Sequence, residues 1–123
     1  MTPGRRILVV DDQEDNRRIL RDLLTAAGFE IVEAVDGEGA VAQAVAEPPD
    51  LILMDIQLPG IDGYEATRRI KGSAALRAVP LIAVTSYALS GDEGRALEAG
   101  CDGYVTKPFS PRALLLKVRE YLR

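Results

Sequence analysis

The sequence RILVVDD, residues 6–12, contains four consecutive apolar residues followed at once by two acids. Three of the four apolar residues, Ile7, Val9 and Val10, are β-branched. An uninterrupted run of this kind is typical of a strand in a parallel sheet whose two faces are both covered by helices. The sequence therefore predicts a buried strand that ends at the acidic pair Asp11-Asp12.

The residues after this pair have helical spacing. Apolar residues one turn apart predict a helix, and Gly28 is positioned to end it as a C-cap. The predicted buried face consists of Ile19, Leu20, Leu23, Leu24 and Ala27.

The same alternation of short apolar runs and amphipathic stretches continues along the chain. Further strands are predicted at 29–34, 51–54, 81–85 and 104–107. Further helices are predicted around Ala40, Val41, Ala44 and Val45 before the Pro48-Pro49 pair, from the turn at 58–63 through about Lys71, at 90–100, and from Ser110-Pro111 through Leu122. Strands that alternate with helices predict a doubly wound α/β fold, with a five-stranded parallel sheet, right-handed crossovers and helices on both faces.

Length and composition indicate one domain, 1–123, with a flexible N-terminal tail at 1–5. The 123 residues are 47% hydrophobic and suffice for a full core, while a single cysteine, Cys101, excludes an internal disulfide. The net charge of -4 disfavours nucleic-acid binding by this chain alone. The apolar runs are too short for a membrane span or a signal peptide, so we expect a cytoplasmic protein.

The absence of histidine excludes His general bases, Ser-His pairs and His-ligated metals. In parallel α/β sheets the active crevice lies at the carboxyl ends of the strands. At these ends the sequence places carboxylates, a hydroxyl and a cation: Asp11-Asp12, Asp55, Thr85-Ser86 and Lys107-Pro108.

These strand-end residues indicate phosphoryl transfer. Three converging carboxylates repel each other, by about 1 kcal/mol per pair at 4 Å in water, and therefore favour a bound cation. Hard oxygen ligands suit Mg²⁺ or Mn²⁺. A carboxylate nucleophile, the ammonium of Lys107 and the hydroxyl of Thr85 complete the groups that stabilise a transferring phosphoryl group.

The chain resembles the receiver domain of two-component response regulators over nearly its whole length. Five features carry the resemblance in order: Val-Asp-Asp at 10–12, Met-Asp-Ile-Gln-Leu-Pro-Gly-Ile-Asp-Gly at 54–63, Val-Thr-Ser at 84–86, Tyr104, and Lys107-Pro108-Phe109. The resemblance implies a flavodoxin-like strand order 2-1-3-4-5. It further implies a phosphoryl group passed from a phosphohistidine of a histidine kinase or histidine phosphotransfer protein to Asp55.

The resemblance also assigns roles to individual residues. Asp11, Asp12, Asp55 and the backbone carbonyl of Gln57 would hold Mg²⁺, and Thr85 and Lys107 would hold the phosphoryl oxygens. Thr85 and Tyr104 would form a switch, and Lys107-Pro108 a cis peptide bond. Gln57 and Tyr87 would flank the path of the water that hydrolyses the phosphoryl group; we expect Tyr87 to obstruct it.

Partners follow from the same resemblance. The donor would dock on the first helix around Asn16, Arg17 and Leu20, and on the loop Phe109-Ser110-Pro111. A downstream protein, or a second phosphorylated copy, would bind the face of the fourth helix, fifth strand and fifth helix. Because no further domain follows Arg123 in this sequence, we expect output by protein contact or by onward transfer of the phosphoryl group to a histidine phosphotransfer protein. Residues 54–59 are similar both to cell-cycle-type single-domain regulators and to receivers of hybrid kinases.

Each of these residues also has a purely structural interpretation. Asp12 could cap the first helix, Thr85 could serve strand propensity, and Lys107 could be a surface lysine. Tyr104 could be core packing, and Cys101 a small apolar filler.

Three other functions are weaker alternatives. A haloacid-dehalogenase-like phosphatase would need a second Asp two residues after the nucleophile, where Gln57 stands. A flavin or dinucleotide binder would need a glycine-rich phosphate loop after a strand, and none is present. A partner-binding domain with an inactive site would lack some of the expected groups.

Overall fold

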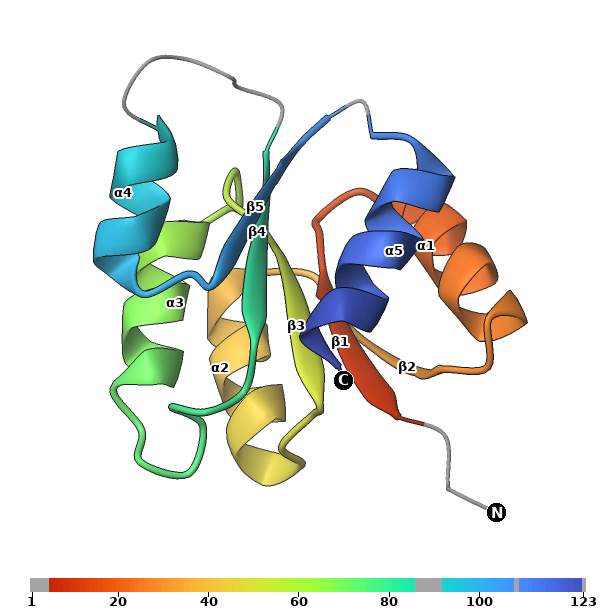
Figure 1. Ribbon diagram of the computed structural model, residues 1–123. Coiled ribbons are helices and arrows are strands. Elements are labelled where there is room, and N and C mark those ends of the chain that lie inside the picture. The colour runs from red at the N-terminus through yellow and green to blue at the C-terminus, as the bar shows by residue number, and fades with distance from the viewer. Residues whose placement is uncertain (1–4, 86–91, 108, 123) are drawn as a thin grey trace.

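The fold is an α/β sandwich built on a parallel sheet (Figure 1). The computed structural model describes residues 5–85, 92–107 and 109–122. The strands are β1 (Arg6–Val10), β2 (Glu30–Ala34), β3 (Leu51–Asp55), β4 (Leu81–Thr85) and β5 (Gly103–Thr106), in the predicted order β2-β1-β3-β4-β5. The helices are α1 (Glu14–Ala26), α2 (Gly37–Ala46), α3 (Gly63–Lys71), α4 (Asp92–Ala99) and α5 (Pro111–Tyr121).

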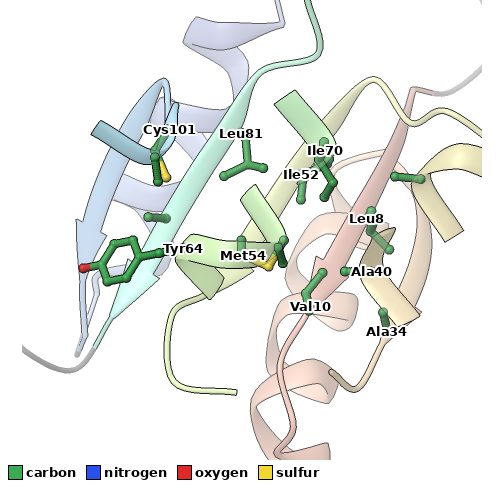
Figure 2. Packing of buried hydrophobic residues seen from close by; sticks show 14 of the residues in the cluster. Leu8, Val10, Ala34, Ala40, Ile52, Met54, Tyr64, Ile70, Leu81 and Cys101 are labelled. Atoms are coloured by element: carbon green, nitrogen blue, oxygen red, sulfur yellow. The ribbon is translucent and has the colours of Figure 1, made fainter. Parts of the chain in front are cut away.

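The central strands bury both faces because their alternate side chains enter two separate cores. Helices α2, α3 and α4 lie on one side of the sheet, and α1 and α5 on the other (Figure 1). Leu8, Ile52 and Met54 point toward the first layer, which Figure 2 shows around Ala40, Ile70 and neighbouring residues. Ile7, Val9, Leu51, Leu53, Ile82 and Val84 face the second layer, where Leu20, Leu24, Leu114 and Val118 cover them. This explains why the strand sequences show no polar alternation.

Helix ends follow the predicted chemistry at two positions. Gly28 lies just past the end of α1, and its φ of +97° favours glycine. Its N–H donates to the Thr25 carbonyl in the last turn of the helix. Ser110 caps α5, where its hydroxyl accepts the Ala113 N–H at 3.3 Å and Pro111 follows.

Two apolar residues that marked the predicted helices are exposed. Ile19 on α1 and Val45 on α2 are 52% and 60% exposed, because the buried stripes pass through Leu20 and Leu24 and through Ala40 and Ala44. The fifth strand also begins and ends one residue earlier than predicted. As a consequence Lys107 lies just beyond β5, at the end of the sheet.

Other expectations concern residues outside the described part of the chain. They include the tail at 1–4 and the start of the fourth helix at Ser90. No described helix has both the length and the apolar character that a membrane crossing requires.

Candidate phosphoryl-transfer site

The carboxyl ends of three strands bring two acids and a lysine together. Asp55 is the last residue of β3, while Asp11 and Lys107 directly follow β1 and β5. The Lys107 ammonium lies 3.1 Å from Asp11 Oδ2 and 3.3 Å from Asp55 Oδ2. Asp11 and Asp55 are buried. The site predicted from strand ends is therefore assembled around a buried ion-paired centre.

The third acid, Asp12, belongs to the same cluster. One carboxylate oxygen from each of Asp11, Asp12 and Asp55 lies within 4.8 Å of the others. Asp12 is exposed, and it does not cap α1, which begins after Gln13 with no side-chain cap. The capping interpretation of Asp12 is therefore wrong, and its carboxylate remains available to a cation.

The two buried carboxylates are oriented by the same local turn. Asp11 Oδ1 accepts the N–H of Gln13 at 2.8 Å, and Asp55 Oδ1 accepts the N–H of Gln57 at 3.0 Å. In both cases an Asp side chain bonds the backbone two residues on, the usual Asx turn. One oxygen of each carboxylate is thereby fixed, and the other faces Lys107.

Burial and charge act against each other in this site. Burial is the main cause that raises the pKa of Asp55, with a further contribution from the charge of Asp11. The Gln57 N–H and the Lys107 ammonium act in the opposite direction. For Lys107, burial lowers the pKa, but the charges of Asp55 and Asp11 outweigh it, and the net pKa is raised. The lysine therefore stays protonated at neutral pH and neutralises part of the acidic charge.

The two predicted switch residues lie on the neighbouring strands β4 and β5. Thr85 is buried at the end of β4, and its carbonyl accepts the Lys107 N–H at 2.6 Å. Tyr104 on β5 is half-buried against the core layer of α3 and α4, opposite Ala83 in the strand register. Both residues are positioned by the β4–β5 pair, while Ser86, Tyr87 and Pro108 lie outside the described residues.

A groove of about 530 Å³ opens beside the acidic centre. It is lined by Asp11, Asn16, Ile19, Leu20, Lys107, Phe109 and Pro111. Asn16, Leu20 and Phe109 were expected to contact the phosphodonor, and they line this groove. The exposure of Ile19 adds an apolar residue that the periodicity had assigned to the core.

Arg17 does not line the groove. Its side chain is 11% exposed and lies against β2, where Nε donates to Glu33 Oε1 at 3.1 Å. Its Nη1 donates to the backbone carbonyl of Asp11 at 2.8 Å. The sequence carries no signal for this contact, because an arginine six residues after the first acid has no characteristic pattern.

Gly63, at the start of α3, was also missed as a site residue. A Cβ there would lie 2.4 Å from the Asp55 carbonyl oxygen and 2.7 Å from Ile56 Cα. The absence of a side chain lets α3 begin directly against the backbone after Asp55. The sequence pattern at 58–63 indicated only a turn at this glycine.

Cys101 is a buried filler, as predicted. Burial is the main cause that raises the pKa of its thiol, and Sγ lies 3.9 Å from Thr67 Oγ1 in the core. A protonated, buried thiol is a poor nucleophile.

Known proteins share this fold and sequence pattern. Residues 7–119 match the family model described as response regulator receiver domain. The polar-differentiation response regulator DivK of Brucella ovis is 41% identical over 118 residues, which cover 96% of each protein.

Solved structures also match this chain. The receiver domain of sensor histidine kinase PA1611 from Pseudomonas aeruginosa PAO1, crystallised with a magnesium ion coordinated in its active-site cleft, has 38% identity and a TM-score of 0.91. The match covers 97% of this chain and 98% of that one. The chemotaxis protein CheY4 of Vibrio cholerae has 27% identity and a TM-score of 0.92, covering 97% and 99%. This chain therefore belongs to the receiver domains of response regulators, the signal-receiving modules of two-component systems.

Proposed function

We propose that Asp55 is the residue of this receiver domain that accepts the phosphoryl group. The observation that supports this most directly is the pairing of a buried carboxylate, at the end of the central strand β3, with the Lys107 ammonium 3.3 Å away. An Asp55 oxygen attacks phosphorus, the phosphorus–nitrogen bond of a phosphohistidine breaks, and its electron pair returns to the imidazole nitrogen. This chain has no histidine, so the phosphohistidine belongs to a partner protein. That partner is a histidine kinase or histidine phosphotransfer protein.

Mg²⁺ fits the acidic cluster by charge and by ligand type. Asp11, Asp12 and Asp55 offer only hard oxygens within 4.8 Å of one another, and the backbone carbonyl of Gln57 is the fourth proposed ligand. When bound, the ion supplies positive charge that offsets the carboxylates and the incoming phosphoryl oxygens. Mn²⁺, which prefers similar ligands, would substitute for it.

The chain's own groups supply the remaining stabilisation. The Lys107 ammonium, already held between Asp11 and Asp55, is placed to pair with a phosphoryl oxygen on Asp55. The Thr85 hydroxyl is a donor at the neighbouring strand end. These groups are fixed before the phosphoryl group arrives, so transfer depends mainly on positioning and charge neutralisation. The domain would thus promote its own phosphorylation and also its own dephosphorylation, the latter slowly. It would turn over no separate substrate.

Intact-mass analysis tests the assignment. Wild type incubated with acetyl phosphate and Mg²⁺ should gain one phosphoryl group, and Asp55→Asn should gain none. Asp50→Asn, which changes an exposed acid at the opposite end of β3, should be phosphorylated like wild type. Labelling that persists in Asp55→Asn would contradict the proposal.

Phosphorylation would be communicated to other proteins through a change in the shape of a protein-binding surface. Thr85 turns its hydroxyl toward the phosphoryl oxygen, Tyr104 moves into the vacated space, and the face formed by α4, β5 and α5 is reshaped. The nearness of both residues on the paired strands β4 and β5 supports this coupling. A downstream protein, or a second phosphorylated copy, binds this face in the cytoplasm.

The lifetime of the phosphoryl group would depend on Gln57 and Tyr87. Each stands two residues after a site residue, Asp55 and Thr85, where the family resemblance implies a position beside the path of attacking water. We expect the phenol to exclude that water. Tyr87→Ala should then accelerate loss of the phosphoryl group roughly tenfold, equivalent to about 1.4 kcal/mol of barrier. A decay rate that is unchanged or slower would remove Tyr87 from the water path.

A further inference from the structure

The guanidinium of Arg17 links α1, β2 and the acidic loop after β1. Nη1 donates to the Asp11 carbonyl at 2.8 Å, Nε donates to Glu33 Oε1 at 3.1 Å, and Nη2 pairs with Glu14. Only 11% of the side chain is exposed. An arginine so enclosed, with its donors directed at separate partners, has one preferred orientation.

The bonded carbonyl belongs to the peptide group that joins Asp11 to Asp12. The other polar groups of Asp11 are also engaged: its N–H donates to the Ala34 carbonyl at 3.2 Å, and its carboxylate oxygens accept from Gln13 and Lys107. Asp11 is therefore held at every polar atom. Among the described residues, Arg17 supplies the hydrogen bond to the following peptide group, at its carbonyl oxygen.

Asp12 has no comparable support. Within the described residues, no hydrogen bond or ion pair holds its carboxylate, which is exposed. The direction in which Asp12 projects therefore depends on its backbone. That backbone is set by the peptide whose carbonyl Arg17 binds.

We propose that Arg17 is a positioning residue for the metal site, which it serves by orienting the Asp11–Asp12 peptide so that the Asp12 carboxylate faces the cluster. This inference rests on the proposed Mg²⁺ site and adds a residue that does not touch the ion. Mutation of a residue that orients a metal ligand commonly weakens metal binding by about 10-fold or more.

The structure explains why arginine suits this role. Glu33 lies on β2, beside β1, and its carboxylate receives donors from both Arg17 and Arg21. The guanidinium can bind Glu33 through Nε and the Asp11 carbonyl through Nη1 at once. A lysine has a single ammonium and could not keep this forked arrangement rigid.

Charge and geometry predict opposite results when Arg17 is removed. Removing a cation beside a site for a divalent cation reduces repulsion, so charge alone predicts tighter Mg²⁺ binding. Loss of the peptide restraint leaves Asp12 free to turn away, so positioning predicts weaker binding. The sign of the change therefore separates the two effects.

The experiment is a calorimetric titration of the unphosphorylated protein with MgCl₂. It compares wild type with Arg17→Gln. We expect the Mg²⁺ dissociation constant to rise roughly tenfold in Arg17→Gln. Arg21→Gln is the matched control, because Arg21 pairs with the same Glu33 and Glu14 but makes no contact with Asp11. Its dissociation constant should stay within about twofold of wild type, on the scale of a surface ion pair.

Thermal unfolding without Mg²⁺ accompanies the titration, so that each variant is titrated well below its own transition. Amide NMR spectra of metal-free Arg17→Gln should differ from wild type mainly around 11–13. A dissociation constant that is unchanged or lower in Arg17→Gln, or an equal rise in Arg21→Gln, would overturn the role of Arg17.

Failure of the metal site itself gives a different result. Wild type that binds no Mg²⁺, or Asp12→Asn that binds it as tightly as wild type, would overturn the proposed ligand set and with it the role of Arg17. Wild-type binding that Asp12→Asn weakens and Arg17→Gln does not would overturn the Arg17 inference alone.

Discussion

At the scale of residues, the buried carboxylates of Asp11 and Asp55 repel each other, and the single ammonium of Lys107 offsets only part of this repulsion. Burial is the main cause of the raised pKa of Asp55. A carboxyl whose pKa is raised by folding stabilises the fold at pH values below its ordinary pKa. That contribution is lost as the pH rises through the raised value. At neutral pH the Asp55 charge therefore lowers the stability of the metal-free protein.

Asp55→Asn should accordingly raise the melting temperature at pH 7 without Mg²⁺. The relief of repulsion is on the order of 1 kcal/mol, or about 4 °C for a domain of this size. The gain should shrink toward pH 4, where the wild-type carboxyl takes up its own proton. Scanning calorimetry at the two pH values measures both effects, and a variant no more stable than wild type at pH 7 would contradict a strained acid pair.

The residues of the site differ in how well the sequence reveals them. Asp11, Asp55 and Lys107 follow from one rule, that polar residues at the carboxyl ends of parallel strands converge. Arg17 could not be identified in this way, because its target is a backbone carbonyl, and a carbonyl leaves no mark in the sequence. The structural interpretation of Asp12 as a cap failed because α1 begins one residue later than that role requires: Gln13 holds the N-cap position and makes no side-chain cap hydrogen bond.

At the scale of elements, the start of α3 is pressed against the end of β3. The Gly63 N–H donates to the Ile56 carbonyl at 2.9 Å, and no side chain fits between them. This contact fixes the turn from which Asp55 and the Gln57 backbone project.

Gly63→Ala should lower the free energy of unfolding by about 2 kcal/mol, because the added methyl meets backbone atoms that cannot move aside. Gly94→Ala is the matched control: a Cβ at Gly94 on α4 meets nothing within 4 Å, and removing a glycine from a helix should raise stability by about 0.8 kcal/mol. Urea unfolding of both variants tests the pair. Equal effects of the same sign would show that close packing at Gly63 does not matter.

The β4–β5 pair should carry the switch. Thr85→Ala should leave phosphorylation by acetyl phosphate largely intact, since Asp55 and Lys107 remain. It should weaken the phosphorylation-dependent NMR shifts around α4, because the hydroxyl whose proposed movement opens space for Tyr104 is absent. Shifts as large as those of wild type would remove Thr85 from the switch.

Helix and strand types were predictable, but the direction of a helix face was less so. Ile19 and Leu20 are adjacent and both apolar, and only packing against α5 and the sheet decides that Leu20 is buried. Val45 is exposed for the same reason, because small residues, Ala40 and Ala44, bring α2 close to the sheet along one narrow line. Periodicity gives a stripe about a third of the helix wide and does not choose its edges.

At the scale of the whole molecule, a bound cation should stabilise the complete fold. Binding to the native state alone adds RT ln(1 + [Mg²⁺]/Kd), or about 1.4 kcal/mol at ten times Kd. The melting temperature of wild type should rise with MgCl₂ and that of Asp12→Asn should not. Scanning fluorimetry across a MgCl₂ series, with KCl at matched ionic strength, measures this. A rise of equal size in Asp12→Asn would show that the ion acts elsewhere.

The architecture was the most predictable level. Buried strands with no polar alternation require cover on both faces, and the intervening helices supply it, so the α/β class follows from β1, β3 and β4. The order β2-β1-β3-β4-β5 came from family resemblance, because periodicity alone does not order parallel strands.

The Lys107 contacts have a consequence for folding during synthesis. Lys107 lies 96 positions from Asp11 and 52 from Asp55, and it is brought to them by the edge strand β5, which pairs only with β4. A chain that has emerged only through β4 already contains the acids but lacks the ammonium between them. Long-range contacts of this kind form late. On the proposed function, competence to accept a phosphoryl group is therefore acquired with β5, and a chain truncated before Lys107 should not be phosphorylated like the finished protein.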